Sequence, residues 1–557
     1  MEETTMTIQE KAAAWMDCPV MTDELLQELR SMNDTEKSDS FYRNLAFGTG
    51  GLRGILGAGT NRMNIFTVIR ATRGLGRYLK EHFEHPSCAV SYDSRIHSRD
   101  FAEMTAASLA DMGIRVSVYP ALEPTPMLSF AVRHLHASAG VMITASHNPA
   151  AFNGYKVYGP DGCQITLDAA RMIQEQISLQ PSLTDRIPDF DEGLRSGMIR
   201  YISGETVEAY YQAVLKLQIH PVTEPLHLVY SPLNGTGNIP VREIMKRLGN
   251  ITVDIVREQE EPDGHFPTCP YPNPEIREAM QLAIRKMMET GADLCFATDP
   301  DCDRMGAAVR NGNDARLITG NEMGILMLDY LCRNTTAGSL PRVVVKTIVS
   351  TEMAGPVCRR YGVELRNVLT GFKFIGEQIG LLEKEGQEDR FLFGFEESYG
   401  YLSGTDVRDK DAVNAALLLC EMASQLKAEG KSLADRLAEL QKEYGCYSQR
   451  LMTYQYEGES GLNRMNSIME GLRQPLTTIG QDELRESERT DYMTGVNGLP
   501  ASDVVEFRLS RGRKIVVRPS GTEPKLKAYL FASGDDPDAA EKELDGLESI
   551  VSALCAK

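Results

Sequence analysis

The sequence predicts a protein of several α/β domains followed by a smaller domain of α+β type. Short apolar runs alternate with helical stretches of about 10–15 residues, which is the rhythm of strand–helix–strand units with parallel strands. This rhythm begins three times, near residues 88, 226 and 342. A chain of 557 residues is also too long for one hydrophobic core, and its length indicates roughly three to five domains.

The first round of this rhythm covers the N-terminal third of the chain. Residues 5–45 are polar and helical, and a glycine-rich stretch follows at 47–59. The pattern then predicts a helix at about 65–82, a buried strand with its exit loop at 88–95, and a helix at about 99–112. The run RVSVYP adds a strand, AVRHLHA a helix, and GVMITASHNP a strand that enters a loop. Ligands of such sheets bind at the carboxyl ends of strands, so these loops are candidate sites.

The second and third rounds repeat the pattern without a close sequence repeat. LHLVYSPLNGTG (226–237) opens the second round, which includes ITVDIV and ADLCFATDPDCD. RVVVKTIVS (342–350) opens the third, which includes VELRNVLTGFKFIG and RFLFGFEESYG. The helical stretch 411–443 resembles a connector. Residues 447–557 then combine the strands VVEFRLS, KIVVRPS and AYLFAS with a terminal helix from about Pro537, which is an α+β pattern.

The composition disfavours several classes of protein. The formal net charge of −19 argues against a general nucleic-acid binder, because phosphate backbones need a basic face. No apolar run approaches the roughly 18 residues that a membrane-spanning helix needs, and the acidic N-terminus lacks the features of a secretory signal. The 11 cysteines are scattered without a C-x-x-C pair, which predicts free thiols and a cytoplasmic location. The oligomeric state stays open.

Two strand-end loops carry residues suited to catalysis. Ser146 lies in TASHNP (144–149) directly after the strand GVMI, where it can face a ligand, although these residues on their own favour a plain Asn-Pro turn. Asp299, Asp301 and Asp303 follow the strand ADLCFAT. Three carboxylates this close repel one another unless a cation lies between them, and carboxylate oxygens suit Mg²⁺. A solvated acidic turn is the alternative.

The aspartate segment does not fit an EF-hand. That loop requires glycine at its sixth position and glutamate at its twelfth, and here these positions hold Arg304 and Arg310. Arg304 instead adds a guanidinium that can face a phosphate next to the metal.

Two further segments are compatible with binding a phosphorylated sugar. RPSGTEP (518–524) offers a guanidinium, two hydroxyl groups and glycine N–H groups for a phosphate, and a surface turn is its plain alternative. GFEESY (394–399) places acidic and hydroxyl groups at a strand end, where sugar hydroxyl groups need acceptors and donors. A solvated turn accounts for this second segment as well.

Taken together, these segments resemble a known family. TASHNP, GYK, DPDCDR, GFEES and RPSGTEP occur in this order, as in the α-D-phosphohexomutase superfamily of phosphoglucomutases and phosphomannomutases. FGTGGLRG, TGFKFIGE and FGFEESYGYL are similar to the bacterial α-phosphoglucomutase branch. The resemblance implies four domains in a heart-shaped arrangement, three related α/β domains with mixed sheets and a C-terminal α+β domain. The expected domains are 1–205 with the phosphoserine loop, 206–325 with the metal loop, 326–445 with the sugar-recognition loop and 446–557 with the phosphate loop.

The resemblance also assigns roles to individual residues. It implies a phosphoserine at Ser146 and a Mg²⁺ ion held by Ser146, Asp299, Asp301 and Asp303. The implied catalytic set is Ser146, His147, Lys156, Arg53 and Lys410. The implied substrate-binding set is Arg304, Glu396, Ser398, Thr370, Gly371 and Lys373. The implied phosphate-binding set is Arg518, Ser520, Gly521 and Thr522.

The activity implied by the resemblance is that of a phosphoglucomutase. Such an enzyme interconverts glucose 1-phosphate and glucose 6-phosphate through glucose 1,6-bisphosphate, which also serves as activator, and its partner is a small phosphosugar. The alternatives are phosphopentomutase, phosphomannomutase and glucose 1,6-bisphosphate synthase. A phosphosugar-binding protein without activity is the alternative from a different class. Neither nucleic acid nor a membrane is an expected partner.

Overall fold

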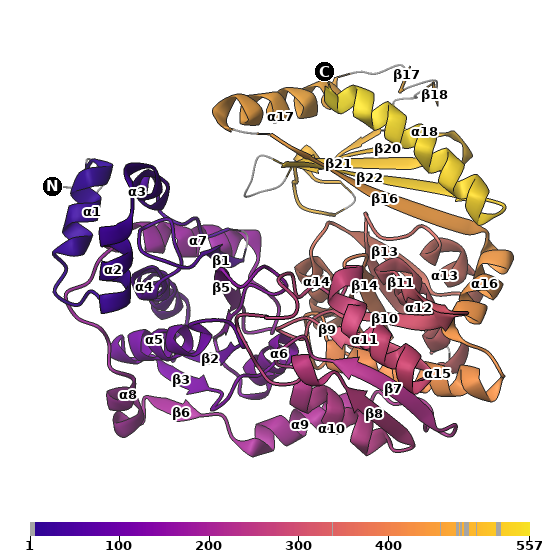
Figure 1. Cartoon of the computed structure of the whole chain (residues 1–557), viewed down its shortest axis with the longest axis horizontal. Helices are drawn as coiled ribbons and strands as arrows, with labels where there is room; N and C mark the ends of the chain where they lie inside the picture. Colours follow the sequence, from indigo (N-terminus) through magenta and orange to yellow (C-terminus); the bar gives the residue numbers. More distant parts are fainter. Residues whose placement is uncertain are drawn as a thin grey trace. The chain divides into compact units, whose positions relative to one another are not determined.

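The computed structural model describes residues 6–48, 50–336, 338–456, 458–474, 478–479, 482–483, 489–496, 498–519 and 525–556. The chain forms two compact units, and Figure 1 labels their helices and strands. The first unit comprises 1–319, 376–391 and 398–428. The second comprises 320–375, 392–397 and 429–557.

The first unit begins with three short helices, α1 Ile8–Met16, α2 Asp23–Ser31 and α3 Asp34–Phe41. Thr7 and Asn33 each form a capping box with the glutamate three residues later, which pairs the free N–H groups at the starts of α1 and α3. Trp15 is 1% exposed, and its ring packs edge-on against Phe41 at 5.5 Å between centroids. The helices predicted within residues 5–45 are therefore present and have their own small core.

The first sheet has the order β1-β5-β4-β2-β3-β6. Its strands are β1 Gly51–Ile55, β2 Ser87–Tyr92, β3 Arg115–Val118, β4 Ala139–Ile143, β5 Phe152–Tyr158 and β6 Ile199–Tyr201. β2 is parallel to β3 and β4, whereas β5 is antiparallel to β4 and β1. The sheet is thus mixed, and its central strands are buried on both faces, as their near-continuous apolar runs predict.

Helices cover both faces of this sheet. They are α4 Ile65–His82, α5 Ser98–Asp111, α6 Thr125–His134, α7 Leu167–Ser178, α8 Phe190–Ser196 and α9 Gly204–Leu215. Apolar residues of α4, α5 and α7 share one buried cluster with Val90, Val141 and Val157 of the sheet. On the opposite face, α6 packs on Met142 and Tyr158. Helices on both faces leave the strand ends as the open positions of the domain.

The second sheet of this unit has the order β11-β10-β9-β7-β8. Its strands are β7 Leu226–Ser231, β8 Ile251–Ile255, β9 Leu294–Thr298, β10 Met305–Asn311 and β11 Asp314–Ile318. The helices are α10 Asn238–Leu248, α11 Arg277–Thr290 and α15 Ala412–Ala428, and the short strand β15 Gly400–Leu402 also belongs to this unit. β7 is parallel to β8 and β9, and β10 returns antiparallel to β9. This antiparallel return places a tight turn at Asp299–Arg304.

The helical stretch 411–443, which resembles a connector in the sequence, forms two helices, and the first of them is not a linker. The chain breaks at Gly430, which has φ +71°, so that α15 ends at Ala428 and α16 spans Leu433–Tyr444. α15 is buried on almost every side, from Ala412 to Leu426, and it contacts α10, β7 and β10. A helix that is apolar all round belongs to a core and not to a linker.

The second unit contains an α/β part. Its strands are β12 Val343–Thr347, β13 Glu364–Val368 and β14 Phe391–Glu396, with β12 parallel to β13 and β14 on its other side. The helices are α12 Gly320–Asn334, α13 Ala354–Tyr361 and α16. The helix α14 Phe372–Lys384 begins in this unit, and its residues from Gly376 onward belong to the first unit. Phe395 packs so closely on α12 that a side chain at Gly324 would overlap its ring.

The C-terminal part of the second unit is an α+β structure. Its antiparallel sheet has the order β16-β22-β21-β20-β19, made of β16 Cys446–Gln455, β19 Arg489–Asp491, β20 Val505–Arg508, β21 Lys514–Pro519 and β22 Lys525–Gly534. A small hairpin pairs β17 Thr478–Ile479 with β18 Asp482–Glu483. α17 Gly458–Arg473 and α18 Pro537–Ala556 pack on one face of the sheet, around Phe507, Ile515 and Leu530 (Figure 1). The predicted fold class, α/β domains followed by an α+β domain, is confirmed.

In the part of the chain that is described, none of the helices combines the length and the hydropathy that crossing a membrane would require.

Candidate functional site

The loop after β4 carries Ser146, which is 3% exposed. Its hydroxyl group donates a hydrogen bond to Asp299 Oδ2 at 2.8 Å. Its oxygen also lies 3.1 Å from His147 Nδ1. The fold therefore brings the serine segment and the aspartate segment together, although 153 residues separate Ser146 from Asp299 along the chain.

The aspartate turn after β9 presents three buried carboxylates on one side. The candidate ligand atoms of Asp299, Asp301 and Asp303 all lie within 4.8 Å of one another. Asp299 Oδ1 accepts hydrogen bonds from the backbone N–H groups of Asp303 and Arg304, at 3.1 and 3.0 Å. These bonds close the turn and hold the carboxylates in place.

Crowding of these carboxylates changes their protonation. Burial, together with the charges of Asp301 and Asp303, raises the pKa of Asp299 well above its usual range. Burial also acts to raise the pKa of Asp301, but the Lys156 ammonium at 2.8 Å outweighs it and lowers that pKa. The three carboxylates therefore repel one another, and a cation bound between them would offset this repulsion.

Two lysines offset part of this charge. Lys156 Nζ, from β5, lies 2.8 Å from Asp301 Oδ2 and 3.4 Å from Asp303 Oδ2. Lys410 Nζ lies 3.3 Å from Asp303 Oδ2 and 3.2 Å from Asp409 Oδ1. Burial alone would lower the pKa of Lys156, but the two aspartates more than compensate and raise it, so Lys156 is a cation at neutral pH.

The carboxylate group fits a divalent metal ion. Among the described residues, Asp301 Oδ1 and Asp303 Oδ1 are buried without a hydrogen-bond partner, which is costly unless a ligand uses them. All the donors are oxygen atoms, as a hard ion such as Mg²⁺ prefers. Asp299, Asp301 and Asp303 therefore form a candidate metal-binding group, consistent with Mg²⁺.

The remaining predicted residues of the first unit lie around this group. Arg53, on β1, donates a hydrogen bond from Nη1 to Asn148 Oδ1 at 3.3 Å. Arg304 pairs with Glu275 Oε1 at 2.5 Å and lies 3.9 Å from Asp303 Oδ1. Burial and the neighbouring guanidinium groups of Arg304 and Arg53 lower the pKa of His147 well below its usual value, so its ring is neutral at pH 7.

The second unit contains a separate acidic group. Glu396, which ends β14, is 5% exposed. Beside it, Glu397 Oε2 accepts hydrogen bonds from Thr347 Oγ1 at 3.1 Å and Ser350 Oγ at 3.3 Å. Burial and the charge of Glu396 raise the pKa of Glu397 to about 7, against the opposing charge of Arg518 on β21. Glu396 and Arg518, predicted from different motifs, thus act on the same carboxyl group.

The other predicted residues of this group lie in turns, at the start of α14 or outside the described residues. Thr370 and Gly371 form the turn between β13 and α14, and Gly371 has φ +122°. Lys373 Nζ lies 5.3 Å from the centre of the Phe374 ring. Ser398 follows β14 in the turn before β15 and is counted with the first unit. The predicted phosphate-binding residues Ser520, Gly521 and Thr522 lie outside the described residues.

Sequence reasoning missed several residues around the Ser146 and aspartate group. Thr125 donates a hydrogen bond from Oγ1 to Asp301 Oδ2 at 2.8 Å, and Tyr158 donates one to Asp409 Oδ2 at 2.8 Å. Asp93 and Arg95 lie under the Ser146 loop. Asp93 and Arg95 lie in the loop that follows β2. Polar residues at strand ends were the signal that singled out Ser146 and Asp299, and the same signal at the end of β2 would have found these two residues.

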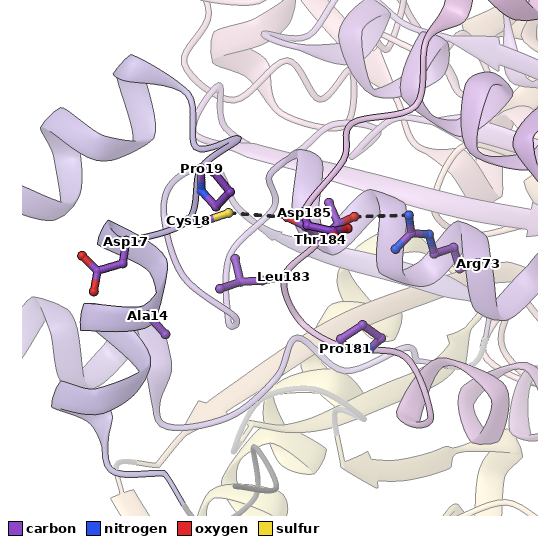
Figure 2. Close-up of a pocket in the computed structure, with 9 residues that line it drawn as sticks. All are labelled: Ala14, Asp17, Cys18, Pro19, Arg73, Pro181, Leu183, Thr184 and Asp185. Atoms are coloured by element: carbon purple, nitrogen blue, oxygen red, sulfur yellow. Dashed lines mark hydrogen bonds between the residues drawn. The ribbon is translucent and has the colours of Figure 1, made fainter.

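A different hollow lies beside the N-terminal helices and shares no lining residue with the Ser146 group (Figure 2). Its volume is about 450 Å³, and it lies between α1, α4 and residues 181–185. Arg73 Nη2 donates to Thr184 Oγ1 at 3.3 Å, and the Cys18 thiol lies 3.5 Å from the Thr184 carbonyl oxygen. None of the predicted site residues lines this hollow.

A serine hydroxyl group beside a buried group of three aspartates, at strand ends of α/β domains, is an arrangement that suits metal-dependent phosphoryl transfer. Models of four phosphoglucomutase/phosphomannomutase domains match the chain: the α/β/α domains I, II and III at residues 44–182, 208–312 and 319–444, and the C-terminal domain at 480–545. The chain therefore belongs to the phosphoglucomutase/phosphomannomutase family of the α-D-phosphohexomutase superfamily, as its motifs predict.

Individual relatives agree with this assignment. The phosphoglucomutase of Staphylococcus saprophyticus is 34% identical over 96% of this chain and 98% of its own length. The phosphoglucomutase of Staphylococcus haemolyticus is 35% identical over 92% of this chain and 95% of its own length. Among solved structures, the phosphoglucomutase parafusin of Paramecium, in its open form, has a TM-score of 0.70 at 17% identity, covering 93% of this chain and 96% of its own. This last likeness shows the fold.

The protonation of Glu397 gives a testable pH dependence. Its pKa is about 7 in the folded protein against 4.5 as its ordinary value, so the folded state holds more protons between these pH values. The stability contributed by the neutral group is therefore complete below pH 4.5 and is lost as the pH rises to about 7. Because Glu397→Gln keeps an acceptor without the charge, we expect it to raise the Tm of the transition that contains this unit at pH 8, by about 3 °C or more, and to change it little at pH 5.

Scanning calorimetry of the full chain at both pH values checks this expectation. Glu470→Gln, at an exposed position of α17 in the same unit, is the matched control and should leave the Tm unchanged at both pH values. An equal change at pH 5 and pH 8 for Glu397→Gln would contradict the assigned pKa.

Proposed function

We propose that this protein is a phosphoglucomutase that interconverts α-D-glucose 1-phosphate and glucose 6-phosphate through a phosphoserine at Ser146 and a glucose 1,6-bisphosphate intermediate. One observation carries the proposal: the Ser146 hydroxyl group lies 2.8 Å from Asp299, within the group of carboxylates suited to Mg²⁺. A protein that only binds phosphosugars needs neither the serine nor the three aspartates there. The names of the Staphylococcus relatives favour glucose phosphate as substrate.

The proposed cycle consists of two phosphoryl transfers. In the first, the bond between phosphorus and Ser146 Oγ breaks, a bond to the free sugar hydroxyl group forms, and the proton of that hydroxyl group passes to the serine oxygen. In the second, Ser146 Oγ attacks the other phosphoryl group of the bisphosphate, and its proton passes to the sugar oxygen that leaves. The phosphoserine and one sugar monophosphate are regenerated, so atoms and charge balance over the cycle.

Each side chain has a part in this cycle. When bound, Mg²⁺ withdraws charge from the transferring phosphoryl group, and Ser146, Asp299, Asp301 and Asp303 would hold it. Among the described residues, the Asp299 carboxylate lies 2.8 Å and the His147 ring nitrogen Nδ1 lies 3.1 Å from Ser146 Oγ. His147 is the proposed group that takes up and returns the proton, because its ring nitrogen is within reach of the serine oxygen.

The cationic residues complete the proposed site. Lys156 and Lys410 neutralise the aspartates, and Arg53 and Arg304 provide positive charge for the phosphoryl group. Glu396 and Ser398, with Thr370, Gly371 and Lys373, would contact the sugar. Arg518, Ser520, Gly521 and Thr522 would hold the phosphate that is not transferred. The division at 1–205, 206–325, 326–445 and 446–557, and the cytoplasmic location, remain predictions.

A coupled assay tests the proposed function. Glucose 1-phosphate, Mg²⁺ and a trace of glucose 1,6-bisphosphate are supplied, and glucose 6-phosphate is followed with a dehydrogenase. We expect turnover that requires the bisphosphate activator and stops when a chelator is added. Mannose 1-phosphate and ribose 1-phosphate are tested in parallel, and a higher kcat/KM on either would replace glucose as the proposed substrate. Formation of bisphosphate from a donor other than a sugar phosphate would instead identify a glucose 1,6-bisphosphate synthase.

A further inference from the structure

The loop that carries Ser146 has a backbone conformation that its sequence does not favour. Ser146 has φ +52°, in the left-handed region, which is sterically unfavourable for residues other than glycine. Such conformations persist only where the surroundings hold them. The loop lies between β4, which ends at Ile143, and β5, which begins at Phe152.

One buried arginine binds the carbonyl groups of this loop. Arg95 Nη1 donates to the carbonyl oxygens of Pro149 at 2.9 Å and Phe152 at 3.0 Å. Arg95 Nη2 donates to the carbonyl oxygen of Ser146 at 2.5 Å and to that of Asn148. The Arg95 side chain is fully buried, and its guanidinium group lies 5.1 Å from the centre of the Phe266 ring. A planar fork of donors suits four carbonyl groups in a way that a lysine does not.

The N–H group of Ser146 is held through a second path to the same arginine. Ser146 N–H donates to Thr144 Oγ1 at 2.8 Å, and Thr144 Oγ1–H donates to Asp93 Oδ2 at 2.6 Å. Asp93 also accepts from Ser98 Oγ at 2.7 Å and lies 3.4 Å from Arg95 Nε. These hydrogen bonds and the Asp93–Arg95 ion pair form a closed circuit of contacts. It runs from the Ser146 N–H group through Thr144, Asp93 and Arg95 back to the Ser146 carbonyl group.

We propose that Arg95, Asp93 and Thr144 are positioning residues, which hold the Ser146 backbone so that its hydroxyl group faces Asp299. The inference rests on the proposed function in treating Ser146 as the group that carries the phosphoryl. A fully buried ion pair costs desolvation energy, and it is weak support for stability alone. Here the ion pair holds the backbone of Ser146 on both sides. Arg95 binds its carbonyl group, and Asp93 binds its N–H group through Thr144. The Ser146 hydroxyl group makes the 2.8 Å contact to Asp299. A displacement of about 1 Å at such a serine lowers the rate by roughly 100-fold.

A matched pair of substitutions at Thr144 tests the inference. Thr144→Val keeps the shape but removes the hydroxyl group, whereas Thr144→Ser keeps the hydroxyl group. We expect Thr144→Val to lower kcat by about 10- to 100-fold with KM changed less than about twofold, because the substrate-binding groups are untouched. Thr144→Ser should retain kcat within about threefold of the original. Equal kcat values for the two variants would overturn the inference.

Hydrogen exchange gives a readout that needs no substrate. Exchange of the backbone amides between residues 139 and 158 is followed by mass spectrometry in the full chain. We expect faster exchange after Ile143 in Thr144→Val, and exchange like that of the original protein in Thr144→Ser. If Thr144→Val fails to fold, Asp93→Asn replaces it, since it weakens the same circuit at similar size. Unchanged kcat and exchange in Asp93→Asn would also overturn the inference.

The two readouts separate this inference from the proposed function. Suppose that the original protein turns over no sugar phosphate, but that amide exchange in the loop is faster in Thr144→Val. This result would contradict the proposed function and would still support the role of Thr144 in holding the loop. A parent protein that turns over glucose 1-phosphate, with both Thr144 variants like it in kcat and exchange, would contradict the positioning role alone.

Discussion

Replacing Ser146 with alanine is expected to lower kcat by about 10⁴-fold or more. The substitution removes the one oxygen that lies 2.8 Å from Asp299 and 3.1 Å from His147, and no phosphoserine can form without it. The change is small and should leave the fold intact, although it removes the side-chain donor to Asp299. The coupled assay measures the loss, and intact mass after incubation with glucose 1,6-bisphosphate measures the phosphoserine.

Ser549→Ala is the matched control for this prediction, because Ser549 lies at an exposed position of α18. The control should keep both the full rate and the added mass of one phosphoryl group. An Ser146→Ala variant that retains a tenth or more of the activity would contradict the phosphoserine mechanism. An added phosphoryl group on Ser146→Ala would show that another residue is modified.

Asp301→Asn is expected to weaken the apparent affinity for Mg²⁺ by at least about 100-fold. Loss of a residue that only hydrogen-bonds to a metal ligand typically lowers metal affinity by about 10- to 100-fold. Loss of a ligand itself should lower the affinity further. The substitution also removes the charge that Lys156 Nζ meets at 2.8 Å, so the lysine would lose its principal partner. We expect a chelator to abolish turnover of the original protein, and added Mg²⁺ to restore it.

Two measurements check this second prediction in the full chain. The Mg²⁺ dependence of turnover gives the apparent affinity, and titration calorimetry with Mg²⁺ alone gives binding without substrate. Asp314→Asn is the control, since Asp314 is an exposed residue of β11 in the same unit. Binding of Mg²⁺ to Asp301→Asn as tight as to the original protein would place the metal elsewhere.

The strand–helix rhythm predicted the fold because the hydrophobic pattern is local. β4 and β9 are apolar along their whole length, and both were predicted from a few consecutive residues. The error at 411–443 has the same origin. A helical pattern there is real, but only packing on all sides distinguishes the buried helix α15 from a connector.

The site could be predicted only where its residues are neighbours in sequence. Ser146 with His147, and Asp299 with Asp301 and Asp303, each form a short motif at a strand end. Glu397 belongs to the motif GFEESY, but its contact with Thr347 escaped prediction because 50 residues separate the two along the chain.

By itself the sequence determined the fold class, the family and the chemical types present in each loop. These properties depend on periodicity and on short runs of residues, which are local. Only the tertiary structure decided that the Ser146 hydroxyl group meets Asp299, that Lys156 neutralises Asp301, and that Asp93 and Arg95 lie beneath the serine loop. Hydrogen bonds and ion pairs act over a few ångströms in space, between residues that the chain separates by 50 to more than 150 positions.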